Sequence, residues 1–166
     1  MNPYFNRIVR ALKLDADLYE EVEADRTAIG QAIGVVVMSA VAESIGYFHS
    51  LNLGRMFMGV LDGLLGWVIW AYIIVFVGTR IIKRPETETD AGELLRTMGF
   101  ASAPGLFFVV GIIPGLQNII ALVVVIWMLA AMIVAVRQAL DYTSTGLAIL
   151  VCCIGLVVRT LIFFVI

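Results

Sequence analysis

The feature that most constrains this chain is a run of 40 residues, Thr97 to Val136, without a single charged side chain. A helix rises about 1.5 Å per residue, so this run is about twice as long as the roughly 30 Å hydrocarbon core of a bilayer requires. The run must therefore fold back on itself. Pro114-Gly115 is the expected hinge, because proline lacks the helical N–H and glycine accepts the backbone angles of a tight turn.

Other apolar stretches of spanning length complete the expected architecture. Hydrophobic residues make up 61% of the 166 residues and charged residues 14%, whereas soluble domains have about 45–50% and 25%. A chain this small cannot bury so many apolar side chains, so a water-soluble globule is excluded. The predicted fold class is all-α: a polytopic membrane protein with a segment at residues 1–26, then a transmembrane domain at residues 27–166 with five helices at about 27–48, 57–82, 97–113, 116–136 and 145–166.

Lysine and arginine predict the orientation of these spans. Nine of these cations lie before the first span, between the second and third, or after the fourth, and Arg55 stands alone on the other side. Short cytoplasmic loops carry the positive excess, so we expect a cytoplasmic N-terminus and an external C-terminus. A cleaved signal peptide is not expected, because the first 25 residues are polar.

The segment before the first span has the pattern of a short amphipathic helix. Its cations, Arg7, Arg10 and Lys13, fall outside the apolar stripe and are suited to anionic lipid, although the acidic run that follows opposes long-range attraction. We interpret it as an interfacial helix in the cytoplasmic leaflet; a helix that docks in a partner's groove has the same pattern. The apolar stripe, at the spacing i, i+3, i+4, i+7, consists of Phe5, Ile8, Val9 and Leu12.

Two acidic pairs have the spacing of a helix N-terminal capping box. Asp17 and Glu20 predict that a second helix begins at Asp17. Asp90 and Glu93 predict a helix start ahead of the third span, which would therefore begin as an interfacial helix.

Three ionisable residues interrupt the predicted spans, and all three are expected roughly 7–11 Å below the outer surface. Such groups are costly at this depth unless they are paired or hydrated. One interpretation is a structural clamp in which the guanidinium binds both carboxylates and ties three helices together. The alternative is a proton or ion site that uses the surplus negative charge. The intramembrane charge cluster consists of Glu43, Asp62 and Arg159.

Two pairs of glycines have the small-xxx-small spacing that lets helix backbones approach closely. They are predicted to mark helix packing, within the bundle rather than between subunits. The pairs are Gly30 with Gly34 and Gly59 with Gly63.

Catalytic and metal-binding motifs are missing from the sequence. It has no His-Glu-x-x-His metal motif and no Gly-x-Ser-x-Gly nucleophile elbow. His49, the one histidine, is expected at the outer interface, and the adjacent Cys152 and Cys153 have no metal spacing. No enzyme activity, catalytic residue, metal or cofactor is therefore expected, and the lack of a basic cluster gives no reason to expect nucleic acid.

Three segments of the chain resemble a known family. They are the acidic run Asp15 to Asp25 that leads into the first span, Leu94 to Pro104 at the start of the third, and Val136-Arg137-Gln138-Ala139 at the end of the fourth. Together they resemble the YIP family of Ypt/Rab-interacting membrane proteins, and nearly the whole chain takes part. The sequence lacks the long cytoplasmic N-terminal region of eukaryotic members, so it is more similar to the prokaryotic branch, and small-GTPase binding is not expected.

The resemblance implies a non-enzymatic integral membrane protein that acts as a scaffold, assembly or trafficking-like factor through helix–helix and partner contacts. It implies a prokaryotic inner or cell membrane, with the lipid bilayer and either a second copy of the chain or other membrane proteins as partners. The alternative is a small ion- or proton-coupled transporter or channel that uses the layer of Glu43, Asp62 and Arg159.

Overall fold

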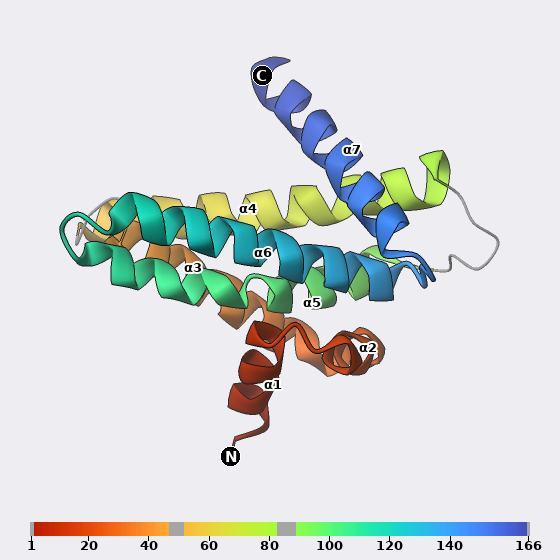
Figure 1. Cartoon of the computed structure of the whole chain (residues 1–166), viewed down its shortest axis with the longest axis horizontal. Coiled ribbons are helices and arrows are strands. Elements are labelled where there is room, and N and C mark those ends of the chain that lie inside the picture. Colours follow the sequence, from red (N-terminus) through yellow and green to blue (C-terminus); the bar gives the residue numbers. More distant parts are fainter. Residues whose placement is uncertain (1, 47–51, 83–88, 166) are drawn as a thin grey trace.

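A computed structural model of the chain describes residues 2–46, 52–82 and 89–165 (Figure 1). Every regular element in these ranges is a helix, which confirms the all-α prediction. In chain order the elements are α1 (Pro3–Leu12), α2 (Ala16–Ala24), η1 (Arg26–Ala28), α3 (Ile29–Gly46), α4 (Leu53–Phe76), the π-helical turn η2 (Val77–Ile81), α5 (Ala91–Ala101), the 3₁₀ helix η3 (Ala103–Ile112), α6 (Gln117–Ala139) and α7 (Thr145–Val165).

Within the described residues, four helical segments are long and apolar enough to cross a membrane by length and composition. They correspond to the first four predicted spans. The fifth predicted span falls on α7, a helix of 21 residues whose apolar part is established only over Thr145–Val158. The count of five therefore stays a prediction. The four segments are Arg26–Gly46, Leu53–Ile81, Ala91–Ile112 and Gln117–Ala139.

Helices α3 to α6 lie side by side in a bundle, and α7 leans away from α4 and α6 (Figure 1). The turn between η3 and α6 is at the expected hinge, where Gly115 adopts a φ of 85° that favours glycine. We call this the Gly115 end of the bundle. The opposite end, beside which α2 packs, is called the α2 end.

The third spanning segment changes from an α-helix to a 3₁₀ helix at Pro104. Proline has no N–H to continue the α-helical ladder, and the backbone N–H of Ser102 already bonds to Gly99 at 3.2 Å in the tighter 3₁₀ pattern. A 3₁₀ helix rises about 2.0 Å per residue, so the ten residues of η3 extend about 20 Å, where an α-helix would extend about 15 Å. The thinner helix also leaves room for a close neighbour.

That neighbour is α3, which lies against α5 and η3 along a line of small residues that we call the glycine seam. A methyl group built on Gly99 would lie 2.6 Å from the Ala32 Cβ, and one on Gly46 would overlap the Phe108 carbonyl. The small residues repeat every seven positions on α3 and every six on the facing helix, since two turns take about seven α or six 3₁₀ residues. The seam consists of Ala32, Ser39 and Gly46 on α3 and Gly99, Gly105 and Gly111 on the facing segment.

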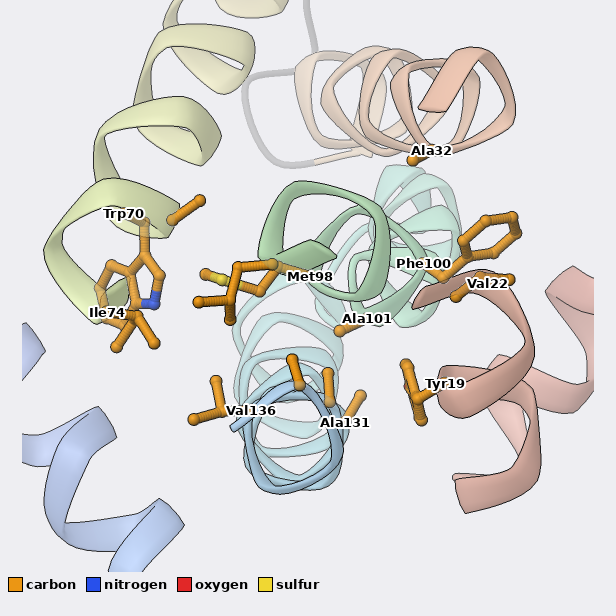
Figure 2. Close-up of a cluster of buried hydrophobic side chains, with 14 of the residues drawn as sticks. Tyr19, Val22, Ala32, Trp70, Ile74, Met98, Phe100, Ala101, Ala131 and Val136 are labelled. Atoms are coloured by element: carbon orange, nitrogen blue, oxygen red, sulfur yellow. The ribbon is translucent and has the colours of Figure 1, made fainter. Parts of the chain in front are cut away.

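The apolar core is concentrated toward the α2 end. Figure 2 shows side chains of α2, α4, α5 and α6 converging around α5, with Met98 directed toward Trp70 and Phe100 beside Val22. Tyr19 of α2 is fully buried, although its hydroxyl has no hydrogen-bond partner among the described residues. Helix α2 is thus part of the core of the bundle.

The glycine seam can be tested with a matched pair of glycine variants. Gly46→Ala should destabilise the protein by about 1–3 kcal/mol, because its methyl group meets backbone that cannot move aside cheaply. Gly30→Ala should be neutral or slightly stabilising, because open space surrounds Gly30 on the same helix. Thermal unfolding in a neutral detergent measures both, and equal midpoints for the two variants would contradict the seam.

Candidate functional site

Helices α1 and α2 form a compact unit that we call the N-terminal platform. Asn2 caps α1 by accepting a hydrogen bond from the Tyr4 N–H at 3.0 Å, and Pro3 occupies the first helical turn. Leu14, with a φ of 58°, turns the chain into α2. The predicted capping box at Asp17 is wrong, because α2 begins at Ala16 and Asp15 is its cap, accepting from the Asp17 N–H at 3.1 Å.

The capping box predicted for the third span is confirmed. Asp90 accepts from the Glu93 N–H at 2.9 Å, and Glu93 accepts from the Asp90 N–H at 3.0 Å. The helix that starts here, α5, continues without a break as far as Ala101.

The predicted apolar stripe of α1 is divided between two environments. Ile8 is buried against the bundle, Val9 and Leu12 are half-buried, and Phe5 is 56% exposed. The helix runs at a steep angle to the bundle axis (Figure 1). An interfacial position for α1 stays a prediction, which the exposed Phe5 supports.

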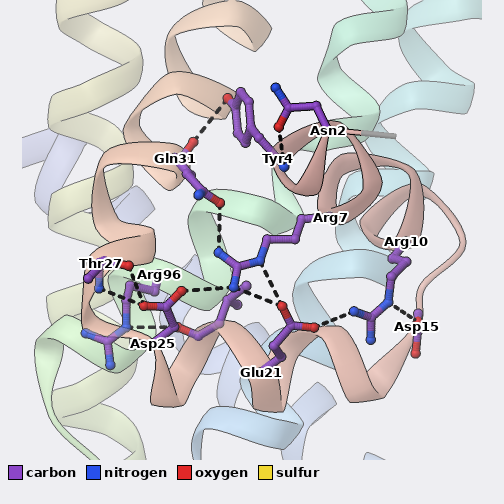
Figure 3. A network of polar contacts seen from close by, with 11 residues as sticks. Asn2, Tyr4, Arg7, Arg10, Asp15, Glu21, Asp25, Thr27, Gln31 and Arg96 are labelled. Atoms are coloured by element: carbon purple, nitrogen blue, oxygen red, sulfur yellow. Dashed lines mark hydrogen bonds and ion pairs between the residues drawn. The ribbon is translucent and has the colours of Figure 1, made fainter.

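Arg7 joins α1 to α2 and α3 (Figure 3). Its guanidinium lies 2.9 Å from carboxylate oxygens of both Glu21 and Asp25, and it also donates to the Gln31 side chain at 2.9 Å. Burial alone would raise the pKa of Glu21, but hydrogen bonds from Arg10 and Arg7 outweigh it and lower that pKa. Glu21 therefore stays ionised at neutral pH and bridges the two arginines.

Arg10 holds the other side of the same acidic residue. It lies 2.5 Å from Glu21 and 2.7 Å from Asp15, and the hydrogen bond from Arg10 lowers the pKa of Asp15. The interpretation that Arg7 and Arg10 face anionic lipid is corrected here, because carboxylates of this chain already bind both cations.

Arg96 attaches the platform to the bundle. Its guanidinium, 7% exposed, donates from Nε to the carbonyl oxygens of Val22 at 3.0 Å and Glu23 at 3.1 Å, and from Nη2 to Glu23 as well. These carbonyls lie in the last turn of α2, where they have no intrahelical donors and where the helix dipole favours a cation. Arg96 thus caps the C-terminus of α2 from α5.

Helix α6 supplies two further tethers. The indole N–H of Trp127 donates to the Leu12 carbonyl at 3.1 Å, and the Gln138 amide donates to Glu20 at 2.6 Å. Burial, with the nearby acid of Asp141, raises the pKa of Glu23 to about 7. The platform therefore contacts α5 and α6 through capped carbonyls, hydrogen bonds and the apolar core.

Replacing Arg96 should release the platform while leaving the bundle intact. Arg96→Met keeps an apolar side chain of similar length but removes the donors to α2, so docking should weaken by about 1–3 kcal/mol. Hydrogen exchange should become faster in residues 3–24 and stay slow in α6. Arg55→Met, at the exposed start of α4, is the control. Unchanged exchange in α2 of the Arg96 variant would refute the cap.

A second feature is a cavity of about 420 Å³ among α3, α4, α5, α6 and α7. Glu43 and Asp62 both line it, so the structure brings these two predicted residues to one site. The side chain of Arg159 and the whole of His49 lie outside the described residues, so the clamp stays a prediction.

The glycines predicted to mark helix packing have different neighbours. A Cβ on Gly59 would meet the Ser44 hydroxyl at 2.7 Å, and one on Gly63 would meet Ala40 at 3.1 Å, so both face α3. Gly34 faces the Tyr4 hydroxyl of α1 and not another span. Nothing lies within 4 Å of a Cβ added at Gly30, which sits on the exposed side of the first turn of α3, so a packing role for Gly30 stays a prediction.

Sequence reasoning missed Arg96 and the glycine seam. Arg96 counted as a loop cation, yet it lies in an apolar helix, and that position is a signal for a buried partner. The spacings of the seam differ between its two helices, so a search for one fixed period does not detect them. Among the described residues there is no group of three or more His, Cys, Asp or Glu side chains that could hold a metal.

A family model described as the Yip1 domain matches residues 16–166, which include α2 and all of the spanning helices. Neither the curated proteins nor the solved structures gave a significant match.

Proposed function

Because the chain belongs to the Yip1 domain family, we propose that this multi-pass membrane protein is a non-enzymatic scaffold or assembly factor. The observation that carries the proposal is the N-terminal platform, which ion pairs, a capped helix terminus and the core hold against the bundle. A scaffold needs a surface of fixed shape outside the lipid, because ordering a flexible one on binding costs conformational entropy.

The platform offers polar groups for such contacts. Asp17 and Glu20 are exposed on α2, and Glu20 lines a small polar depression of about 260 Å³ together with Arg137 and Gln138. The partner is a second copy of the chain or another membrane protein. Small-GTPase binding is not part of the proposal, because the platform is only two short helices.

The filling of the bundle favours a scaffold over a transporter or channel. The cavity that contains Glu43 and Asp62 does not continue as a polar path through the described residues of the α2 end. Ile74, Leu94 and Leu140 are fully buried there and fill the space between the helices. Transporters place polar groups at broken helices near the midplane, whereas the 3₁₀ segment here packs against small, uncharged residues of α3, Ser39 and Gly46.

For orientation we propose that the platform is cytoplasmic and that the Gly115 end and the C-terminus are external, in a prokaryotic inner or cell membrane. The support is the excess of lysine and arginine on the platform side.

Single cysteines test this orientation. In a background where Cys152 and Cys153 are replaced by alanine, Asn2→Cys and Ser144→Cys should react with an impermeant maleimide only after the membrane is opened. Asn52→Cys should react in intact cells, because it precedes α4 at the Gly115 end. Labelling of Ser144→Cys in intact cells would reverse the topology.

Crosslinking in native membranes tests the scaffold. A photoreactive residue at Asp17 should capture defined partner proteins, and Arg96→Met should reduce this capture several-fold, because the platform is no longer held in place. The same residue at Ile119, on the exposed apolar face of α6, is the control for lipid-side contacts. Capture that Arg96→Met leaves unchanged would contradict the proposal, as would proton or ion flux in liposomes above that of empty ones.

A further inference from the structure

The cavity among the spanning helices has a polar end and an apolar end. Glu43 and Asp62 lie toward the Gly115 end, whereas Trp70, Met98 and Met132 line it toward the α2 end. Eight residues separate Asp62 from Trp70 along α4, so the two ends are about 12 Å apart at 1.5 Å per residue. The volume of about 420 Å³ lies within the usual range for small-molecule sites.

Among the described residues, the polar end holds two acidic side chains and no cation. Glu43 and Asp62 have no ion pair or hydrogen bond with any described side chain, and all of the described ion pairs lie in the N-terminal platform. Glu43 and Asp62 both line the cavity, and both residues are exposed. Two like charges next to a bilayer favour a positively charged occupant.

The rest of the lining suits an apolar body. Methionine side chains are flexible and polarisable, so Met98, Met128 and Met132 can adapt to ligands of different shape. Trp67, which lines the cavity, is 91% buried as a residue, and its indole N–H has no acceptor among the described residues. The aromatic faces of the tryptophans would attract a nearby ammonium group.

We infer that this cavity binds a monocationic amphiphile, with its ammonium group between Glu43 and Asp62 and its apolar chain along Trp67, Trp70 and the methionines. A metal ion fits less well, because two carboxylates are too few protein ligands and no third His, Cys, Asp or Glu joins them among the described residues. A phospholipid headgroup fits less well too, because its phosphate would lie beside the carboxylates. The inference is independent of the scaffold proposal.

Bromine-labelled probes test whether the cavity binds a cationic amphiphile, because bromine quenches tryptophan fluorescence on contact. The full chain, purified in a neutral detergent, is titrated with 8-bromooctylamine and with 8-bromooctanol, which differ only in the charged group. Quenching by the amine should be saturable and about ten-fold tighter than quenching by the alcohol. Equal affinity for the two probes would overturn the inference.

Variants locate the site. Glu43→Gln with Asp62→Asn should abolish the preference for the amine, whereas Glu20→Gln, on the platform, should keep it. A preference that survives the double change would overturn the inference. A preference for the amine that is missing in the unaltered protein and appears only in Arg159→Gln would also overturn it. That result would mean that Arg159 already binds the two carboxylates in the unaltered protein. If the double variant does not fold, the unaltered protein is treated with a carbodiimide, which labels accessible carboxyl groups. Octylamine should then protect Glu43 or Asp62 from labelling, and a lack of protection would count against the site.

Discussion

The guanidinium of Arg96 and the C-terminal carbonyls of α2 satisfy each other's requirements. A helix end inside a protein leaves carbonyls without donors, and an arginine inside an apolar helix bundle leaves donors without acceptors. The hydrogen bonds between them hold α2 against α5 and α6. Arg7 and Arg10 then join α1 to α2 through Glu21, so one buried cation and two half-buried ones position everything before the first span.

The bundle itself depends on a match between two kinds of helix. Pro104 changes the third span to a 3₁₀ helix, whose three residues per turn differ from the 3.6 of α3. Small residues at intervals of six on one helix and seven on the other keep the two backbones in register despite this difference. The close approach leaves little space between α3 and η3, and the cavity forms instead toward α4 and α7.

Local patterns were read correctly where the interaction is local. The Asp90 capping box joins residues three apart, and the hinge at Gly115 depends on the backbone of two adjacent residues. The same pattern at Asp17 gave a wrong helix start, because the chain turns at Leu14 and Asp15 caps the helix. Asp17 therefore lies inside α2. The sequence also predicted the apolar stripe of α1, but the bundle decides which of its residues are buried. Ile8 is therefore buried, whereas Phe5 is exposed.

The sequence by itself determined the class of protein, the length of its spans and the points where the chain turns, because these follow from apolar length against bilayer thickness and from backbone chemistry of neighbouring residues. The depths of Glu43 and Asp62 in their spans predicted from the sequence that the two acids share one layer, but only the tertiary structure shows that both line one cavity. The choice of partners for Arg7, Arg96 and Trp127 also needed it. Arg96 and Val22 lie 74 residues apart and Trp127 and Leu12 lie 115 apart. Many donors and acceptors compete at such separations, and helix packing selects among them.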